Sequence, residues 1–135
     1  MPLFEWSQEL SVKIKKIDEQ HKKLVDLINL LHDSMKEGKG RDVMGKVLTD
    51  LAEYTRYHFQ TEEMLFEKYA YPGYLPHKRE HDNLTDQVNE LKAKFEQGDT
   101  VITMELMGFL KTWLNHHILE SDQRYSLFLN SKGVV

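Results

Sequence analysis

The chain has 135 residues, enough for one domain with a real hydrophobic core. Its 40% hydrophobic and 30% charged residues make it globular rather than disordered, and a net charge of −4 argues against nucleic-acid binding, because no basic surplus neutralises phosphates. The absence of cysteine excludes disulfides, thiolate zinc sites and iron–sulfur clusters. Any metal must therefore be bound by nitrogen and oxygen atoms.

The first residues, MPLFEWSQEL, carry Glu5 and Glu9 and contain no apolar run, so we do not expect a signal peptide. No stretch of the chain approaches the ~20 consecutive apolar residues of a membrane span. We therefore expect a cytoplasmic protein with no membrane span.

Four segments show the helical spacing of apolar residues, and turn signals separate them. We predict helices over residues of about 18–37, 42–69, 75–97 and 101–128. Asp18 is the expected N-cap of the first helix, and the aperiodic residues 1–17 predict an N-terminal arm. Short connections make consecutive helices antiparallel neighbours. The predicted fold is all-α: an up-down-up-down antiparallel four-helix bundle with the arm packed on it, in a single domain over 1–135.

Each predicted helix carries a histidine on the apolar stripe that faces the core. The inward-facing polar residues are His21, His58, Glu62, His77, His81 and His117. A single buried histidine is ordinary, but five imidazoles and a glutamate in one small core are costly unless they are satisfied together. In an antiparallel bundle all six positions fall at the same end, so a shared metal site is the simplest explanation.

Two other histidines do not fit this site. His32 lies eleven residues beyond His21, about 16 Å along the helix axis, and we expect it at the surface or near a helix end. His116 is turned ~100° from His117, and the stripe through Trp113 favours His117 as the inward residue.

Asp122 is undecided by spacing alone. It lies five residues after His117, which is about 140° around an ideal α-helix. A wide site or a local π-type bulge would bring its carboxylate to the same face.

With Asp122 included, seven side chains are too many for one ion and suit two. Nitrogen and carboxylate donors favour iron or manganese in octahedral geometry, whereas zinc prefers four ligands. Five histidines, two bridging carboxylates and one oxo or hydroxo bridge leave a single position open. We expect His77, His81 and His117 on the saturated ion. His21 and His58 then hold the ion with the open position, which accepts one small ligand.

The expected wall of the open position is apolar, formed by Leu24, Phe59, Trp113 and Leu114. No acid or base on the apolar stripe is evident beside it, and the ligand set is richer in histidine than that of ferritin-like di-iron enzymes. This combination favours reversible dioxygen binding over substrate oxidation.

The sequence resembles the hemerythrin family, and more closely its single-domain bacterial members. The residues that carry the resemblance are FEW near the start, IDEQH at 17–21, YHFQTEE at 57–63, YP at 71–72, HKREH at 77–81 and WLNHHILESD at 113–122. They span nearly the whole chain, and as a set they are highly specific, although HxxxH alone is weak.

The resemblance implies the same division of histidines between a saturated and an open iron. Glu62 and Asp122 look like the two bridging carboxylates. The family's histidine-to-aspartate spacing of five is met by His117 and Asp122, which favours both as ligands. The implied cofactor is two iron ions with an oxo or hydroxo bridge.

Dioxygen is implied to bind end-on at the open iron, the one held by His21 and His58. Trp113 and Leu114 resemble pocket-lining positions. One departure lies in the arm, where Lys13 stands in place of the small residue that the family leads us to expect.

We therefore favour a non-enzymatic oxygen carrier or store, with an unidentified oxygen-consuming enzyme as a possible recipient. The alternatives are a di-iron oxidase, peroxidase or nitric-oxide-handling enzyme that uses the same open position, an oxygen or redox sensor, and a bundle whose metal is structural or absent.

Overall fold

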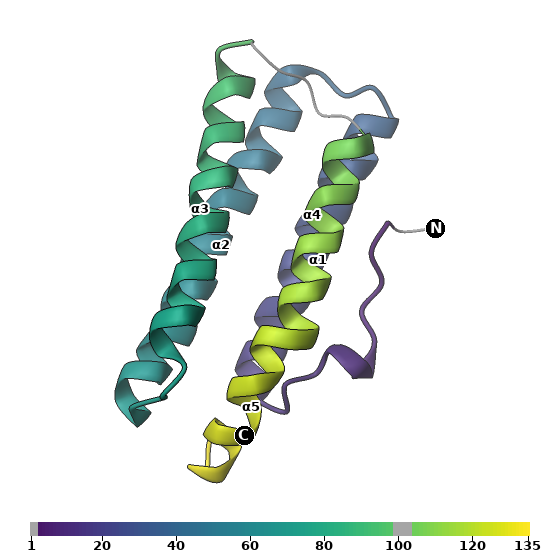
Figure 1. Ribbon diagram of the computed structural model, residues 1–135. Helices are drawn as coiled ribbons and strands as arrows, with labels where there is room; N and C mark the ends of the chain where they lie inside the picture. Colours follow the sequence, from purple (N-terminus) through teal and green to yellow (C-terminus); the bar gives the residue numbers. More distant parts are fainter. Residues whose placement is uncertain (1–2, 99–103) are drawn as a thin grey trace.

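The structure is a computed structural model that describes residues 3–98 and 104–135, and these residues form helices and no strands. The long helices are α1 (Lys15–Lys36), α2 (Arg41–Tyr69), α3 (Tyr74–Glu96) and α4 (Met104–His116). The fourth helix continues through the π-helical segment η2 (His117–Asp122) into α5 (Gln123–Ser131), and a short 3-10 turn, η1 (Gln8–Leu10), precedes α1. Figure 1 shows the resulting four-helix bundle, as predicted.

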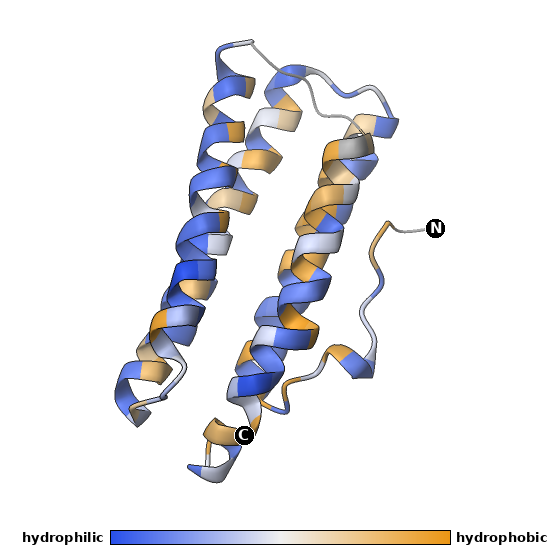
Figure 2. Cartoon of the chain, viewed as in Figure 1, coloured by the Kyte–Doolittle hydropathy of each residue, from blue (hydrophilic) through white to orange (hydrophobic). Residues whose placement is uncertain are grey.

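In the bundle, α1 packs against α2 and α4, and α2 also packs against α3. Hydrophobic residues recur at helical intervals along the helices in Figure 2, with hydrophilic residues between them. One apolar cluster, which includes the fully buried Leu31, Leu48 and Met107, fills one end. A second, which includes Phe66 and Leu129, fills the other. Each buried side chain of this size contributes roughly 1.5–3 kcal/mol, so the two clusters hold the helices in register.

The N-terminal arm packs on the bundle as predicted, through hydrogen bonds at both of its ends. The Phe4 amide donates to Asn29 Oδ1 at 2.9 Å, and Asn29 Nδ2 donates to the Phe4 carbonyl at 2.7 Å. Near α1, Gln123 Nε2 donates to the Ser11 carbonyl at 3.1 Å. The arm therefore bridges α1 and α5, and its described residues, 3–14, lie beside the bundle (Figure 1).

The prediction that Asp18 caps the first helix is wrong. Helix α1 begins at Lys15 after Ile14, whose side chain makes no capping bond. The Asp18 carboxylate instead accepts hydrogen bonds from the Ser11 hydroxyl and from the Val12 amide, the latter at 2.8 Å. Asp18 looks like an N-cap in sequence because its carboxylate does bind an amide, but that amide belongs to the arm.

The remaining helix ends lie close to their predicted positions, with α2 ending at Tyr69 and α5 extending to Ser131. Residues 101–103, where the fourth helix was predicted to begin, lie outside the described residues. In the turn before α3, a Cβ added at Gly73 would meet the outer end of the Tyr71 ring at 2.7 Å, so a larger residue there would have to displace that side chain. No helix in the described part of the chain has the length and apolarity needed to cross a membrane.

Candidate metal centre

The seven predicted ligands come together in one buried cluster between the two apolar ends of the bundle. Helix α1 contributes one, α2 two, α3 two and η2 two: His21; His58 and Glu62; His77 and His81; His117 and Asp122. None of the seven is more than 5% exposed. Burial of this many ionisable groups requires mutual pairing or a bound cation.

The cluster divides into two overlapping groups of donor atoms. One consists of three histidines and both carboxylates, and the other of two histidines and a carboxylate; within each, the donor atoms lie within 4.8 Å of one another. Glu62 belongs to both groups. The histidines are therefore shared three to two, with His77, His81 and His117 in the larger group.

Asp122 spans the two groups because η2 is π-helical. Its Oδ1 lies 3.0 Å from His77 Nε2 and 3.2 Å from His117 Nε2, whereas its Oδ2 lies 3.1 Å from His21 Nε2. A π-helix bonds i to i+5, so a residue five positions along returns to nearly the same face. The wide turn thus brings Asp122 under His117, which spacing alone did not decide.

Glu62 also lies between the groups. Its Oε1 is 3.1 Å from His81 Nε2 and 3.3 Å from His58 Nε2. Its Oε2 accepts a hydrogen bond from the hydroxyl of the fully buried Tyr125 on α5. Burial and the charges of Glu62 and Asp122 raise the pKa of Tyr125 well above its ordinary value, so the hydroxyl keeps its proton.

Most of the inward-facing atoms have no hydrogen-bond partner in the described part of the chain, although their neighbours lie only 3.0–3.9 Å away. They are the Nε2 atoms of His21, His77, His81 and His117, Glu62 Oε1 and both Asp122 oxygens. These atoms point toward the centre of the cluster, where they face one another instead of hydrogen-bond donors. A cation satisfies such a set at once, so these residues fit the group that the predicted site requires.

The outward nitrogen of His58 shows that its ring is held in the metal-binding form. His58 Nδ1 lies 2.7 Å from Gln20 Oε1, which can only accept, so Nδ1 carries the proton. Gln20 Nε2 donates to Thr61 Oγ1 at 3.3 Å, and this contact fixes which way the amide points. The lone pair of His58 Nε2 therefore faces the centre.

Two other histidines predicted as ligands contact carboxylates through their outward nitrogens. His81 Nδ1 lies 2.9 Å from Glu63 Oε2, and His117 Nδ1 lies 3.0 Å from Glu80 Oε2. Together with Gln20, these partners escaped the sequence analysis because none of them lies on an apolar stripe. A signal was present, since each is the direct sequence neighbour of a proposed ligand and reaches the histidine of the next helix.

The charges within the cluster are strongly interdependent. Burial lowers the pKa of His58 to about 3. Burial also acts to lower the pKa of His117, but Asp122 and Glu80 outweigh it and raise that pKa to about 10. Without a metal, a proton therefore stays on His117 at neutral pH, and a cation that binds there must displace it.

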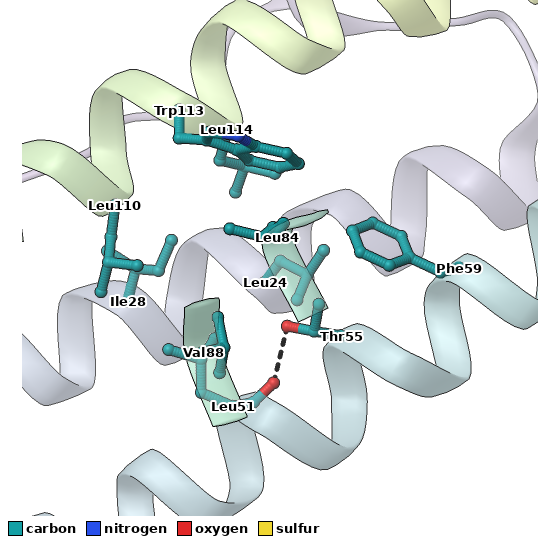
Figure 3. A pocket seen from close by; sticks show the side chains of 10 residues that line it. All are labelled: Leu24, Ile28, Leu51, Thr55, Phe59, Leu84, Val88, Leu110, Trp113 and Leu114. Carbon is teal, nitrogen blue, oxygen red and sulfur yellow. Dashed lines mark hydrogen bonds between the residues drawn. The ribbon is translucent and has the colours of Figure 1, made fainter. Parts of the chain in front are cut away.

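Figure 3 shows an apolar cavity, whose volume is about 20 Å³. Its wall includes Leu24 and Leu114, each about one helical turn from His21 or His117. All four predicted pocket residues line it: Leu24, Phe59, Trp113 and Leu114. Among the described lining residues, Thr55 alone carries a hydroxyl, which donates to the Leu51 carbonyl at 2.7 Å. The volume is enough for one molecule the size of water, but a water would find too few polar partners there.

The predicted orientation of His116 agrees with the structure, because its side chain is 68% exposed and lies 3.3 Å from the Glu120 carboxylate. His32 was expected at the surface or near a helix end. It lies one turn before the end of α1, but it is only 5% exposed and so is not at the surface. Helix α1 is covered by both α2 and α4, so its buried face is wide enough to include His32 beside Leu31. His32 belongs to neither donor group.

Most of the chain is similar to known hemerythrins. The family described as "Hemerythrin HHE cation binding domain" matches residues 12–126. Bacteriohemerythrin from Pseudomonas paraeruginosa is 38% identical over 120 residues, covering 89% of this chain and 77% of that protein. Bacteriohemerythrin from Methylococcus capsulatus is 33% identical over 132 residues, covering 97% of this chain and 100% of that protein.

A crystal structure of wild-type hemerythrin superposes with a TM-score of 0.88 at 34% identity, covering 92% of this chain and 95% of that one. Sequence, fold and the buried histidine–carboxylate cluster agree, and the chain belongs to the hemerythrin family as a hemerythrin-type iron protein.

Proposed function

We propose that the protein binds dioxygen reversibly, as a carrier or store, at two iron ions held by the buried cluster and joined by an oxo or hydroxo bridge. The proposed ligands are His21, His58, Glu62, His77, His81, His117 and Asp122. The observation that carries the proposal is the three-to-two division of histidines beside a dry apolar cavity.

The unequal division is what supplies a binding position. Glu62 belongs to both groups, and Asp122 Oδ2 reaches within 3.1 Å of His21 Nε2, so the side of His21 and His58 has one nitrogen donor fewer than the other side. An octahedral ion held there would lack one ligand, and a small molecule could complete it. When bound, iron supplies the reversible electron transfer that holds dioxygen.

The protein supplies the surroundings that favour binding over turnover. Leu24, Phe59 and Leu114 exclude water from the cavity beside the open position. Thr55 is the one hydroxyl among the described residues of the wall, and its proton is donated to the Leu51 carbonyl. None of the described lining residues is an acid or base that could deliver a proton to a bound ligand, which a peroxidase or oxidase needs.

The test is to load the protein with iron, reduce it anaerobically and admit air. We expect two irons per chain and an optical charge-transfer band that appears with oxygen and disappears when oxygen is removed. His77→Ala should lose iron and the band, because it removes a donor of the larger group. His116→Ala should keep both, because that side chain is 68% exposed and outside the cluster. Steady oxygen consumption with a reductant would contradict the proposal and indicate an enzyme.

A further inference from the structure

The outward contacts of the ligand histidines differ in charge between the two sides of the cluster. On the His21 and His58 side, the partner of His58 is the neutral amide of Gln20, at 2.7 Å. On the other side, the partners of His81 and His117 are the carboxylates of Glu63 and Glu80, at 2.9 and 3.0 Å. One side therefore has two anionic contacts and the other a neutral one.

Both carboxylates are held against their histidines. Lys78 Nζ lies 3.9 Å from Glu63 Oε1, which leaves Oε2 to His81. Glu80 Oε2 is buried and lies 3.0 Å from His117 Nδ1. Gln20 is only 4% exposed and is fixed by Thr61, so its amide stays in place as well.

Such contacts change what an imidazole donates to a metal. When the Nδ1–H of an imidazole donates to a carboxylate, its Nε2 becomes a stronger electron donor to a metal. A neutral amide in place of the carboxylate increases the electron donation from Nε2 by less. A nearby negative charge in a buried site also stabilises the more positive state of an ion. Both effects favour the ferric state on the side of Glu63 and Glu80.

We propose that Gln20, Glu63 and Glu80 are positioning residues that make the two iron sites electronically unequal. Glu63 and Glu80 favour the ferric state of the iron held by His77, His81 and His117, and the neutral Gln20 leaves the iron with the open position less electron-rich. This inference rests on the di-iron centre of the proposed function but not on its binding of dioxygen.

Three variants of matched shape test the inference: Glu63→Gln, Glu80→Gln and Gln20→Glu. The readouts are the midpoint potential from a spectroelectrochemical titration and the Mössbauer spectrum of the reduced, iron-loaded protein. Glu63→Gln and Glu80→Gln should raise the midpoint potential and alter the signal of the same iron. Gln20→Glu should lower the potential and alter the signal of the other iron.

Glu120→Gln is the matched control, because Glu120 is 54% exposed, lies in the same π-helical segment and contacts the non-ligand His116. It should leave the potential and both iron signals unchanged. Equal potentials in all the variants, or a Glu120→Gln shift as large as that of Glu80→Gln, would overturn the inference.

The two proposals fail in different ways. Site-specific potential shifts in a protein that binds no dioxygen would support the unequal irons and contradict the dioxygen carrier. Reversible dioxygen binding with unshifted potentials would do the reverse. A protein that takes up no iron would overturn both.

Discussion

Each partnered histidine of the cluster uses both ring nitrogens for different tasks. All five histidines proposed as ligands turn Nε2 toward Glu62 or Asp122, at 3.0–3.3 Å for the nearest contacts. His58, His81 and His117 point Nδ1 outward to a side chain of the neighbouring helix. The outer contact orients each ring so that its Nε2 faces the centre, although on His117 a cation must first displace a proton.

His32 is also buried, but neither of its ring nitrogens makes a contact like those of the cluster histidines. Both of its ring nitrogens lack a hydrogen-bond partner in the described part of the chain, and its one near acid, Asp33, is 3.9 Å away. A buried unsatisfied polar group costs about 1–3 kcal/mol. His32→Leu should therefore raise the free energy of unfolding by about 1 kcal/mol in urea denaturation.

His116→Leu is the control for that measurement, because it makes the same replacement on an exposed side chain and should change stability little. If His32→Leu destabilised the protein by more than His116→Leu did, the imidazole of His32 would have a stabilising contact that its geometry does not suggest.

At the scale of the elements, local departures from regular helix place the ligands. The π-helical η2 turns Asp122 back toward the cluster. The arm reaches α1 through Lys13, whose φ of 57° lies in the left-handed region. The family resemblance led us to expect a small residue at this position, and the backbone explains why, since a side chain there is strained.

Lys13→Gly should relieve that strain and raise the free energy of unfolding by about 1 kcal/mol. Lys13→Ala is the control, because it removes the charged side chain but keeps the Cβ, and it should bring no such gain. Chemical denaturation of the three proteins measures the difference. An equal gain from Lys13→Ala would show that the side chain, and not the backbone, is the source of the strain.

At the scale of the whole molecule, the bundle has a layer of buried ionisable side chains between two apolar ends. The cluster of seven ionisable side chains lies between the apolar core around Leu31 and the apolar core around Phe66. At the cluster, the four helices of the bundle contact one another through ionisable groups. Such a level stabilises the fold only when its charges are compensated. A bound cation should therefore contribute to stability as well as to function.

Removing iron should lower the melting temperature, and the gap between loaded and metal-free protein should widen from pH 6 to pH 8. In the metal-free chain the pKa of His117 is raised from 6.5 to about 10, so its stabilisation is present below pH 6.5 and is lost as the pH rises through 10. Iron must displace that proton, so iron affinity rises with pH.

Thermal melts of both forms across this range, with calorimetry in two buffers to count released protons, test the prediction. A constant gap and no proton release would show that His117 is already deprotonated in the metal-free protein.

The helical spacing of apolar residues predicted the bundle and most of the proposed ligands, because this spacing indicates which face of each helix is buried. His21, His58, Glu62, His77, His81 and His117 all lie on predicted stripes, and the structure gathers them at one level. In an antiparallel bundle, a position early in one helix lies beside a position late in the next helix, and this rule was enough to predict that the six residues lie at the same height. These are properties of single helices and of their order, which a sequence carries directly.

Contacts between helices were decided only by packing. The width of the buried face of α1 made His32 a core residue, and the approach of the arm made Asp18 its partner instead of a helix cap. Gln20, Glu63 and Glu80 acquire their roles only when the next helix presents its histidine within 3.0 Å. The π-helical turn of η2 decided the position of Asp122, because helical spacing in the sequence does not show where bonding changes from i+4 to i+5.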